Sequence, residues 1–99
     1  MAGRLTAAGS IAVDTGAVTA LRDGNSLLPA GVTDVEGDFA RGDIIDIADE
    51  NGALVARGLS EYASEAVDRI KGRKSTELEA ILGYAPRPAL VHRNHMVLL

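Results

Sequence analysis

The chain has 99 residues, enough for one domain with a single core, and its hydrophobic residues (46%) are almost all aliphatic, with 3% aromatic. Cysteine is absent, which excludes disulfide bonds, thiolate catalysis and cysteine-bound zinc, and no apolar run approaches the roughly 18–20 residues that span a bilayer. The net charge of −4 counts against nucleic-acid binding by the surface as a whole, and the first ten residues lack the apolar stretch of a signal peptide.

The first predicted elements are a short strand and a helix. Residues 10–14 alternate between apolar and polar side chains, which indicates a strand at the start of the fold. Asp14 or Thr15 can then cap a helix that runs through Leu21. Gly24 suits the left-handed position after the last turn, so we expect the helix to end there.

A turn and a second strand follow this helix. We expect Leu27 and Leu28 to point into the core, and Pro29 to lie at the entry to a strand or at an edge, because proline cannot donate to a strand ladder. The backbone turns sharply at Gly31. Residues 32–38 then predict the second strand.

The middle of the chain predicts a hairpin. Residues 39–42 form a corner, and residues 44–49 alternate as the next strand. The Asn-Gly pair within residues 50–52 is the strongest short-range signal for a hairpin turn. Residues 53–59 are therefore the returning strand.

The last part of the chain predicts two helices and a closing strand. The first helix spans residues 61–71 and is capped by Ser64 or a neighbour, and the second spans 77–82 from a capping box of Thr76 and Glu79. Glycines end both helices: Gly72 and Gly83. Prolines keep the next segment extended, and the chain closes with a strand pair or one broken strand: Pro86, Pro88, residues 90–91 and residues 96–99.

Short strands therefore outnumber helices, which predicts a mixed, mainly β fold: a small barrel with two or three flanking helices. Charge is unevenly placed along the chain. Residues 34–50 hold seven carboxylates against Arg41 alone, whereas residues 69–99 hold six basic side chains against two acidic ones. The fold could separate these segments into an acidic and a basic face, or both could be ordinary solvated surfaces.

Sequence motifs for phosphate binding, metal binding and catalysis are weak or absent. No GxxxxGK[ST] or GxGxxG pattern occurs, and the serines lack a nucleophile motif. His92 and His95 would face opposite sides of a strand, as would Asp43 and Asp46, because side chains alternate. We therefore expect no metal site, no converging carboxylate pair and no catalytic residue.

Seven motifs, in order and spacing, resemble the C-terminal PUA domain of bacterial glutamate 5-kinases. (PUA is named for pseudouridine synthases and archaeosine transglycosylases.) They are GRL, VDTGAVTAL, SLLPAGV, VEGDFARGD, ARGLSEY, STELEAILGY and VHRNHMVLL. The resemblance covers residues 2–99 and implies a PUA-like pseudo-barrel of about five to six short strands. In that family an amino-acid kinase domain lies upstream, so residues 1–99 look like a single excised domain with an artificial start at Met1.

The resemblance has one departure. The family usually closes with His-Arg-Asp-Asn before its last apolar run, whereas this chain has His92-Arg93-Asn94-His95. A carboxylate is lost and an imidazole is gained, so a role that depends on that acid is not carried over.

The resemblance also implies a cellular context. Such kinases use ATP and Mg²⁺ to phosphorylate the γ-carboxylate of glutamate, the first step of proline biosynthesis in the cytoplasm. Their catalytic and feedback sites lie in the kinase domain, so this chain should have no kinase activity and no cofactor of its own. A regulatory or assembly module is the first hypothesis, with the kinase domain or a second copy as partner.

RNA binding is the alternative hypothesis. PUA domains of other proteins bind structured RNA with the loop before the second strand and with the last strand, and that loop is here residues 25–31. The basic stretch 69–74 could add phosphate contacts, although bases at a helix C-terminus also complement the helix dipole. The candidate RNA-binding residues are Asn25, Ser26, Pro29, Ala30, Gly31, Lys71, Arg73, Lys74 and Arg93.

Overall fold

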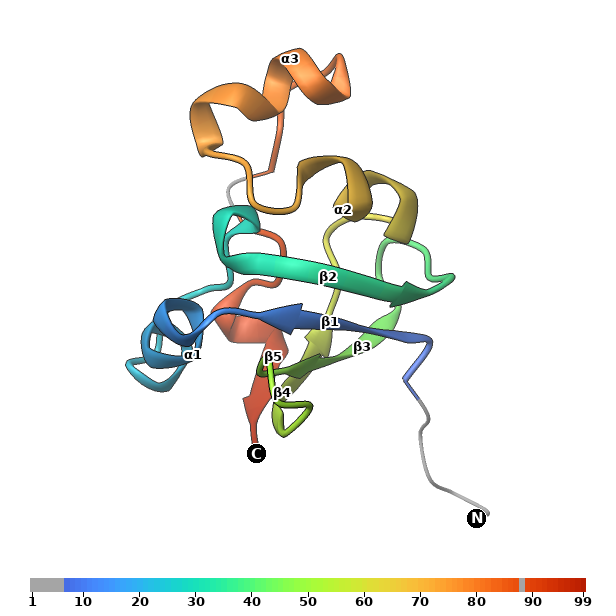
Figure 1. Ribbon diagram of the computed structural model, residues 1–99. Helices are drawn as coiled ribbons and strands as arrows, with labels where there is room; N and C mark the ends of the chain where they lie inside the picture. Colours follow the sequence, from blue (N-terminus) through green and yellow to red (C-terminus); the bar gives the residue numbers. More distant parts are fainter. Residues whose placement is uncertain (1–6, 88) are drawn as a thin grey trace.

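The computed structural model describes residues 7–87 and 89–99, and its framework is a five-stranded sheet with three helices (Figure 1). The strands are β1 (Gly9–Val13), β2 (Val32–Gly37), β3 (Ile44–Ala48), β4 (Leu54–Leu59) and β5 (Met96–Leu98). The α-helices are α1 (Thr15–Arg22), α2 (Ser64–Ile70) and α3 (Leu78–Leu82). Three short 3-10 helices are η1 (Pro29–Gly31), η2 (Ser75–Glu77) and η3 (Arg93–His95). The mainly β fold expected from the sequence is confirmed.

The strands lie in the order β2-β1-β3-β4-β5, so β2 and β5 form the two edges of the sheet. β1 runs parallel to β3 and antiparallel to β2, while β3–β4 and β4–β5 are antiparallel pairs. Helix α1 and η1 connect β1 to β2 on one side of the molecule. This placement leaves the loop between α1 and β2 near the end of the sheet.

Alternating side chains of the inner strands build the core. Ile11 pairs with Ile47 across the parallel ladder, and Ile45 and Val13 lie on the same buried side. All four are at most 1% exposed, and burying each such side chain contributes roughly 1.5–3 kcal/mol. The core is therefore aliphatic, as the composition predicts.

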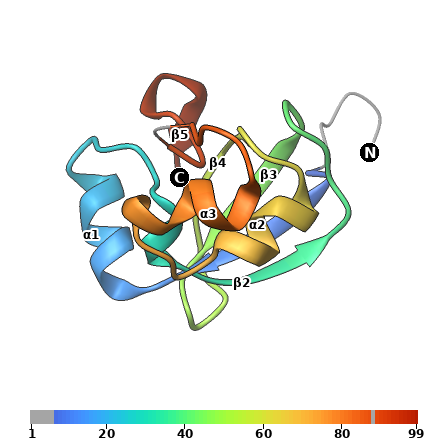
Figure 2. The ribbon, with the colours of Figure 1, turned by 90° about the horizontal axis from the view of Figure 1, so that it is seen from above.

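Helices α2 and α3 lie on the β2 side of the sheet and cross in front of the strands in the view of Figure 2. Helix α2 packs against β2 and contributes the buried Val67 and Ile70, while α3 packs against α2 through Leu78 and Leu82. The β2 side of the sheet is thereby covered by the chain itself.

In the first half of the chain, the predicted cap of α1 and the predicted hairpin turn both form. The Asp14 carboxylate caps α1 by accepting a hydrogen bond of 2.7 Å from the Ala17 N–H. In the turn between β3 and β4, Asp49 Oδ1 accepts hydrogen bonds of 2.9 Å from the Asn51 and Ala53 N–H groups. Gly52 follows with a φ of 87°, which only glycine adopts easily. The hairpin prediction is confirmed.

Two predictions near the core are wrong. Leu28 is 48% exposed, because the backbone is extended there and neighbouring side chains point to opposite sides once Leu27 is buried. Helix α2 begins at Ser64 without a side-chain cap. The Ser64 hydroxyl instead accepts a hydrogen bond from the Phe39 N–H at 3.2 Å, which fastens the corner after β2 to the helix.

The C-terminal half also differs from the prediction. The capping box of Thr76 and Glu79 does not form, since neither η2 nor α3 has a side-chain cap. Residues 92–95 are not a strand: His92 caps η3, and only β5 continues the sheet. Val91 joins Leu27 through an isolated bridge. The extended conformation expected at Pro88 lies outside the described residues.

Candidate functional site: a groove beside helix α1

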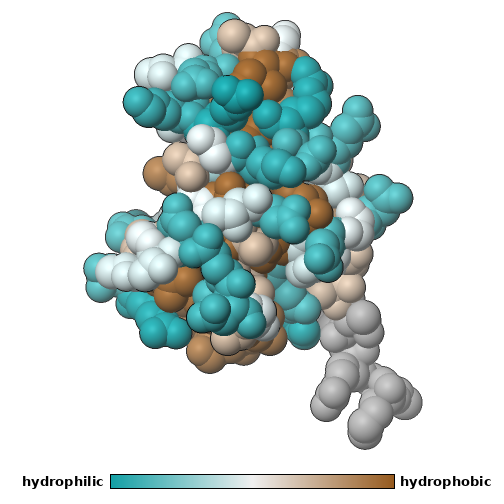
Figure 3. Space-filling model, in the orientation of Figure 1, coloured by the Kyte–Doolittle hydropathy of each residue, from teal (hydrophilic) through white to brown (hydrophobic). Residues whose placement is uncertain are grey.

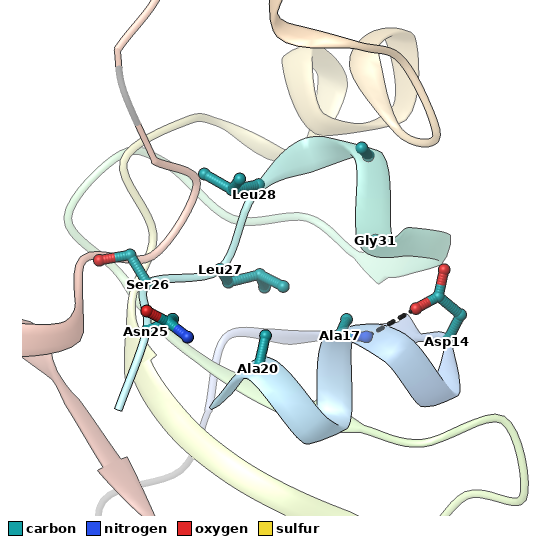
Figure 4. A pocket seen from close by; sticks show the side chains of 9 residues that line it. Asp14, Ala17, Ala20, Asn25, Ser26, Leu27, Leu28 and Gly31 are labelled. Atoms are coloured by element: carbon teal, nitrogen blue, oxygen red, sulfur yellow. Dashed lines mark hydrogen bonds between the residues drawn. The ribbon is translucent and has the colours of Figure 1, made fainter. Parts of the chain in front are cut away.

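A groove of about 560 Å³ lies between α1 and the loop of residues 25–31 (Figure 4). Most of its lining is apolar, with polar groups at its two ends. We call it the α1 groove, and its lining residues are Asp14, Ala17, Ala20, Asn25, Ser26, Leu27, Leu28, Ala30 and Gly31. Four of the predicted RNA-binding residues are among them, namely Asn25, Ser26, Ala30 and Gly31.

The groove exists because small residues allow the loop to approach α1. A Cβ atom on Gly31 would lie 2.6 Å from the Ala17 Cβ, so only glycine fits at this point. The Asp14 N–H donates to the Gly31 carbonyl at 3.0 Å, which fixes η1 against the start of α1. The Ala17 and Ala20 side chains then form one apolar wall, with Leu27 between helix and loop (Figure 4).

Two distant parts of the chain hold the loop in place. Leu27 exchanges hydrogen bonds with the segment before η3: its N–H donates to the Val91 carbonyl at 2.9 Å, and its carbonyl accepts from Leu90 at 2.8 Å. The Ser26 hydroxyl accepts a hydrogen bond of 2.9 Å from the Arg93 N–H. The Gly72 N–H donates to the Pro29 carbonyl at 2.9 Å. The predicted loop, the basic stretch and Arg93 are thus brought together.

Two of the four predicted basic site residues, Lys71 and Arg73, are paired with carboxylates nearby in the sequence. Lys71 Nζ lies 2.5 Å from Asp68 Oδ1, a hydrogen bond that raises the pKa of Lys71. Arg73 contacts the Glu77 carboxylate at 3.7 Å. The Arg69 side chain, in the last turn of α2, donates to the Ile81 carbonyl. These partners would compete with phosphate for the three cations.

Three predicted residues stand apart from this pairing. Lys74 and the side chain of Arg93 are exposed and form no ion pair among the described residues. Pro29 is buried in η1 with its carbonyl already bonded, so its ring is not available to a ligand. The apolar wall and the exposed Leu28 were missed by the sequence analysis, although alanines spaced three apart opposite a glycine are a signal of close packing.

The two histidines do not occupy opposite faces of a strand, because that region is the 3-10 helix η3. Their ring centroids are 5.7 Å apart. His95 Nδ1 lies 3.9 Å from the Glu61 carboxylate, which also contacts Arg87 Nη1 at 3.6 Å, beside a cavity of about 130 Å³. Within the described ranges, no group of three or more His, Cys, Asp or Glu side chains gathers to hold a metal ion.

The two aspartates considered as a carboxylate pair both have structural partners. Asp43 Oδ2 accepts a hydrogen bond of 2.8 Å from the Ala40 N–H and so shapes the corner before β3. Asp46 Oδ1 accepts one of 2.7 Å from Arg57 Nε across the β3–β4 ladder. For the part of the chain that the structure describes, no helix has the length and apolar character to cross a bilayer.

The sequence pattern of the PUA domain matches residues 9–82, and the chain belongs to the PUA domain family. Curated relatives that match the whole length of the chain are glutamate 5-kinases. The chain is 60% identical over 99 residues to the glutamate 5-kinase of Zymomonas mobilis and covers 25% of that protein. It is 59% identical to that of Sphingopyxis alaskensis and covers 27%. The chain therefore spans about a quarter of these relatives and matches their C-terminal portion.

Solved structures share the fold. A PUA domain from Aeropyrum pernix, in a tartrate complex, superposes with a TM-score of 0.66 at 31% identity, covering 89% of this chain and 42% of that one. A chain of an H/ACA ribonucleoprotein bound to a substrate RNA gives a TM-score of 0.57 at 25% identity, covering 60% of this chain and 19% of that one. These similarities confirm the expected PUA fold.

Proposed function

We propose that this chain is the regulatory and assembly module of a cytoplasmic glutamate 5-kinase. The parent enzyme would use ATP and Mg²⁺ to phosphorylate the γ-carboxylate of L-glutamate, the first step of proline biosynthesis, in a domain outside residues 1–99. The observation that carries the proposal is the identity of 52–60% along the chain with glutamate 5-kinases about four times as long.

The surface chemistry favours protein contacts for this module. Three of the basic side chains in residues 69–74 have partners nearby, and the carboxylates of Asp43 and Asp46 stabilise turns and ladders. Two exposed surfaces are apolar: the α1 groove with Leu28, and the edge of the sheet at β5. Apolar surface of this kind is typical of contacts within or between polypeptides.

The test compares a purified glutamate 5-kinase related to this chain with the same enzyme lacking the module. We expect the truncated enzyme to keep phosphoryl transfer but to change in oligomer size, in feedback inhibition by proline or in KM. Identical kinetics, feedback and mass for the two proteins would refute the regulatory role. The isolated 99-residue chain, assayed with ATP and glutamate, should form no product.

Recognition of structured RNA is the second candidate. The specific observation in its favour is that hydrogen bonds from backbone N–H groups join the loop of residues 25–31 to Arg93 and to Gly72, which brings three segments together. Lys74 and Arg93 are the cations best placed to contact phosphates, since the other bases of this region are paired.

Fluorescence anisotropy with a labelled structured RNA tests this candidate. If it is correct, binding persists at physiological salt, weakens as salt rises, and falls about tenfold or more in the double variant Lys74→Glu, Arg93→Glu. Arg41→Glu, a charge reversal at an exposed corner of the acidic region, is the matched control. Equal affinities for both variants and the unchanged chain would exclude RNA recognition by this surface.

A further inference from the structure

The two edges of the sheet have opposite chemistry. Strand β2 carries the exposed carboxylates of Asp34 and Glu36, and α2 packs against it. Strand β5 carries no charged side chain, and Val97 and Leu98 are 65% and 44% exposed. Proteins normally protect an edge strand with charges, proline or a covering element. Edge β2 has such protection, whereas edge β5 is short, at three residues, and among the described residues has no charge, proline or covering element.

Exposed apolar residues gather around β5. Leu99 follows the strand and is 66% exposed, and its N–H donates to the Val55 carbonyl at 2.9 Å. Leu54, the neighbour of Val55, is 45% exposed at the same end. Figure 3 shows hydrophobic residues collected at the lower end of the molecule, where Figure 1 places the C-terminus.

The backbone of β5 also offers unused hydrogen-bonding groups. Because the Leu99 N–H points to β4, strand alternation directs the N–H groups of Val97 and Leu99 toward β4 and those of Met96 and Leu98 away from it. No described strand pairs with β5 on that outer side. The edge therefore presents both apolar side chains and a free backbone ladder.

We propose that β5 pairs with the β5 strand of a second copy of this chain, antiparallel about a two-fold axis, and so continues the sheet across a dimer. This inference rests on the assembly part of the proposed function. The uncharged edge can meet its own copy without repulsion, and antiparallel pairing of like strands is self-complementary. Pairing of β5 with β2 of the next copy would instead set apolar side chains against Asp34 and Glu36, which favours a closed dimer over a chain of copies.

The size of the edge predicts the strength of the contact. Stable interfaces bury about 800 Å² on each partner. Four exposed aliphatic side chains and a three-residue strand form a contact smaller than that, so the dimer should be weak and its population should depend strongly on protein concentration. Tethering to a larger oligomer would raise the effective concentration and strengthen the contact.

Sedimentation equilibrium of the 99-residue chain over a wide concentration range tests the dimer. The average mass should rise from 10.3 kDa toward twice that value. Val97→Lys should keep the mass at 10.3 kDa, since it brings like charges together at the pairing strand. Thr33→Lys places the same side chain on the exposed edge β2 and should leave dimerisation unchanged.

A second variant tests whether the outward N–H groups of β5 take part in the pairing. Leu98→Pro removes an N–H that points away from β4, so it should leave the monomer folded and reduce dimerisation at least tenfold. Thermal unfolding followed by circular dichroism checks that both variants fold. A monomeric chain at all concentrations, or a dimer that survives both Val97→Lys and Leu98→Pro, would overturn the proposal. A monomeric chain combined with altered kinase assembly on truncation would overturn only this inference and leave the regulatory function standing.

Discussion

Strands β2 and β5 lie at opposite edges of the same sheet and differ in how they are protected from pairing with another strand. At β2 the chain protects itself: carboxylates line the strand, α2 covers it, and η1 is fastened to Gly72. At β5 the last residues stay apolar and exposed. Helix α2 therefore covers the β2 edge of the sheet, and no described α-helix packs against the β5 edge. This difference indicates where an assembly contact can form.

Each edge also depends on a glycine where backbones approach closely. A Cβ atom on Gly9 would lie 2.7 Å from the Glu36 carbonyl oxygen, at the β1–β2 junction. One on Gly58 would lie 2.8 Å from the His95 carbonyl oxygen, where β4 meets η3 and β5. A substitution at Gly9 should therefore disturb the β2 edge alone, and one at Gly58 the β5 edge alone.

The largest loss of stability is expected at Leu27, because this residue contacts the segments that lead to both edge strands. Leu27 is 1% exposed and links the loop before β2 to the segment before β5. Leu27→Ala should lower the free energy of unfolding by about 2–5 kcal/mol through lost burial and a cavity. Leu28→Ala is the matched control, since Leu28 is 48% exposed, and should cost less than about 1 kcal/mol. Urea denaturation measures both, and equal losses would contradict the assigned burial.

Gly58→Ala should separate the two edges. The added methyl group meets Val91 Cγ1 at 2.7 Å and the His95 carbonyl, so β5 must shift, at a cost of about 1–3 kcal/mol. Gly9→Ala should destabilise the chain by a similar amount at the β2 edge. Only Gly58→Ala should also reduce dimerisation in sedimentation equilibrium. A dimer weakened equally by both substitutions would show that β5 has no special role.

Tyr62→Phe should loosen the segment that leads to β5. The Tyr62 hydroxyl accepts a hydrogen bond of 2.6 Å from the Arg87 N–H and donates one to the Arg87 carbonyl at 3.2 Å. Their loss should cost about 1–2 kcal/mol in denaturant unfolding at neutral pH.

The same residue predicts an alkaline pH dependence. Burial raises the pKa of Tyr62 above 10.0, against the lowering effect of the Arg87 backbone hydrogen bond. Its contribution to stability is therefore present below pH 10 and lost as the pH rises through the higher pKa of the folded state. Tyr62→Phe should lack this part of the alkaline loss. Parallel stability curves for the two proteins above pH 10 would contradict the prediction.

Asp46→Asn should give the smallest effect. The ion pair of Asp46 with Arg57 is partly exposed and lies in the middle of the sheet, between the two edges. Its loss should cost at most about 1 kcal/mol, less at high salt, and should leave dimerisation unchanged. A clear change in oligomer mass would mean that the contact involves the sheet face as well as the edge.

The sequence predicts those parts of the fold that are encoded locally. The α1 cap at Asp14 and the hairpin at residues 50–52 depend on side chains within a few positions, and both are confirmed. The conformation of residues 92–95 could not be predicted in this way. It depends on contacts with residues far away in the chain, such as the bond from Arg93 to Ser26, which competes with a continuous strand.

The candidate site shows the same limit. Sequence resemblance pointed to residues 25–31, and the structure adds the α1 groove, because the approach of Gly31 to Ala17 appears only in three dimensions. Charge counting indicated a basic segment at residues 69–74, but it could not show that Asp68 and Glu77 pair with Lys71 and Arg73. Pairing of this kind depends on side-chain geometry as well as composition.

Residue-resolved hydrogen exchange at two protein concentrations tests the open edge most directly. The Met96 and Leu98 amides point away from β4, so the account predicts that their exchange slows as the concentration rises through the dimer Kd. The amides of β2 should exchange at the same rate at both concentrations. Exchange at Met96 and Leu98 that does not depend on concentration, or equal slowing along β2, would contradict the assignment of β5 as the contact between copies.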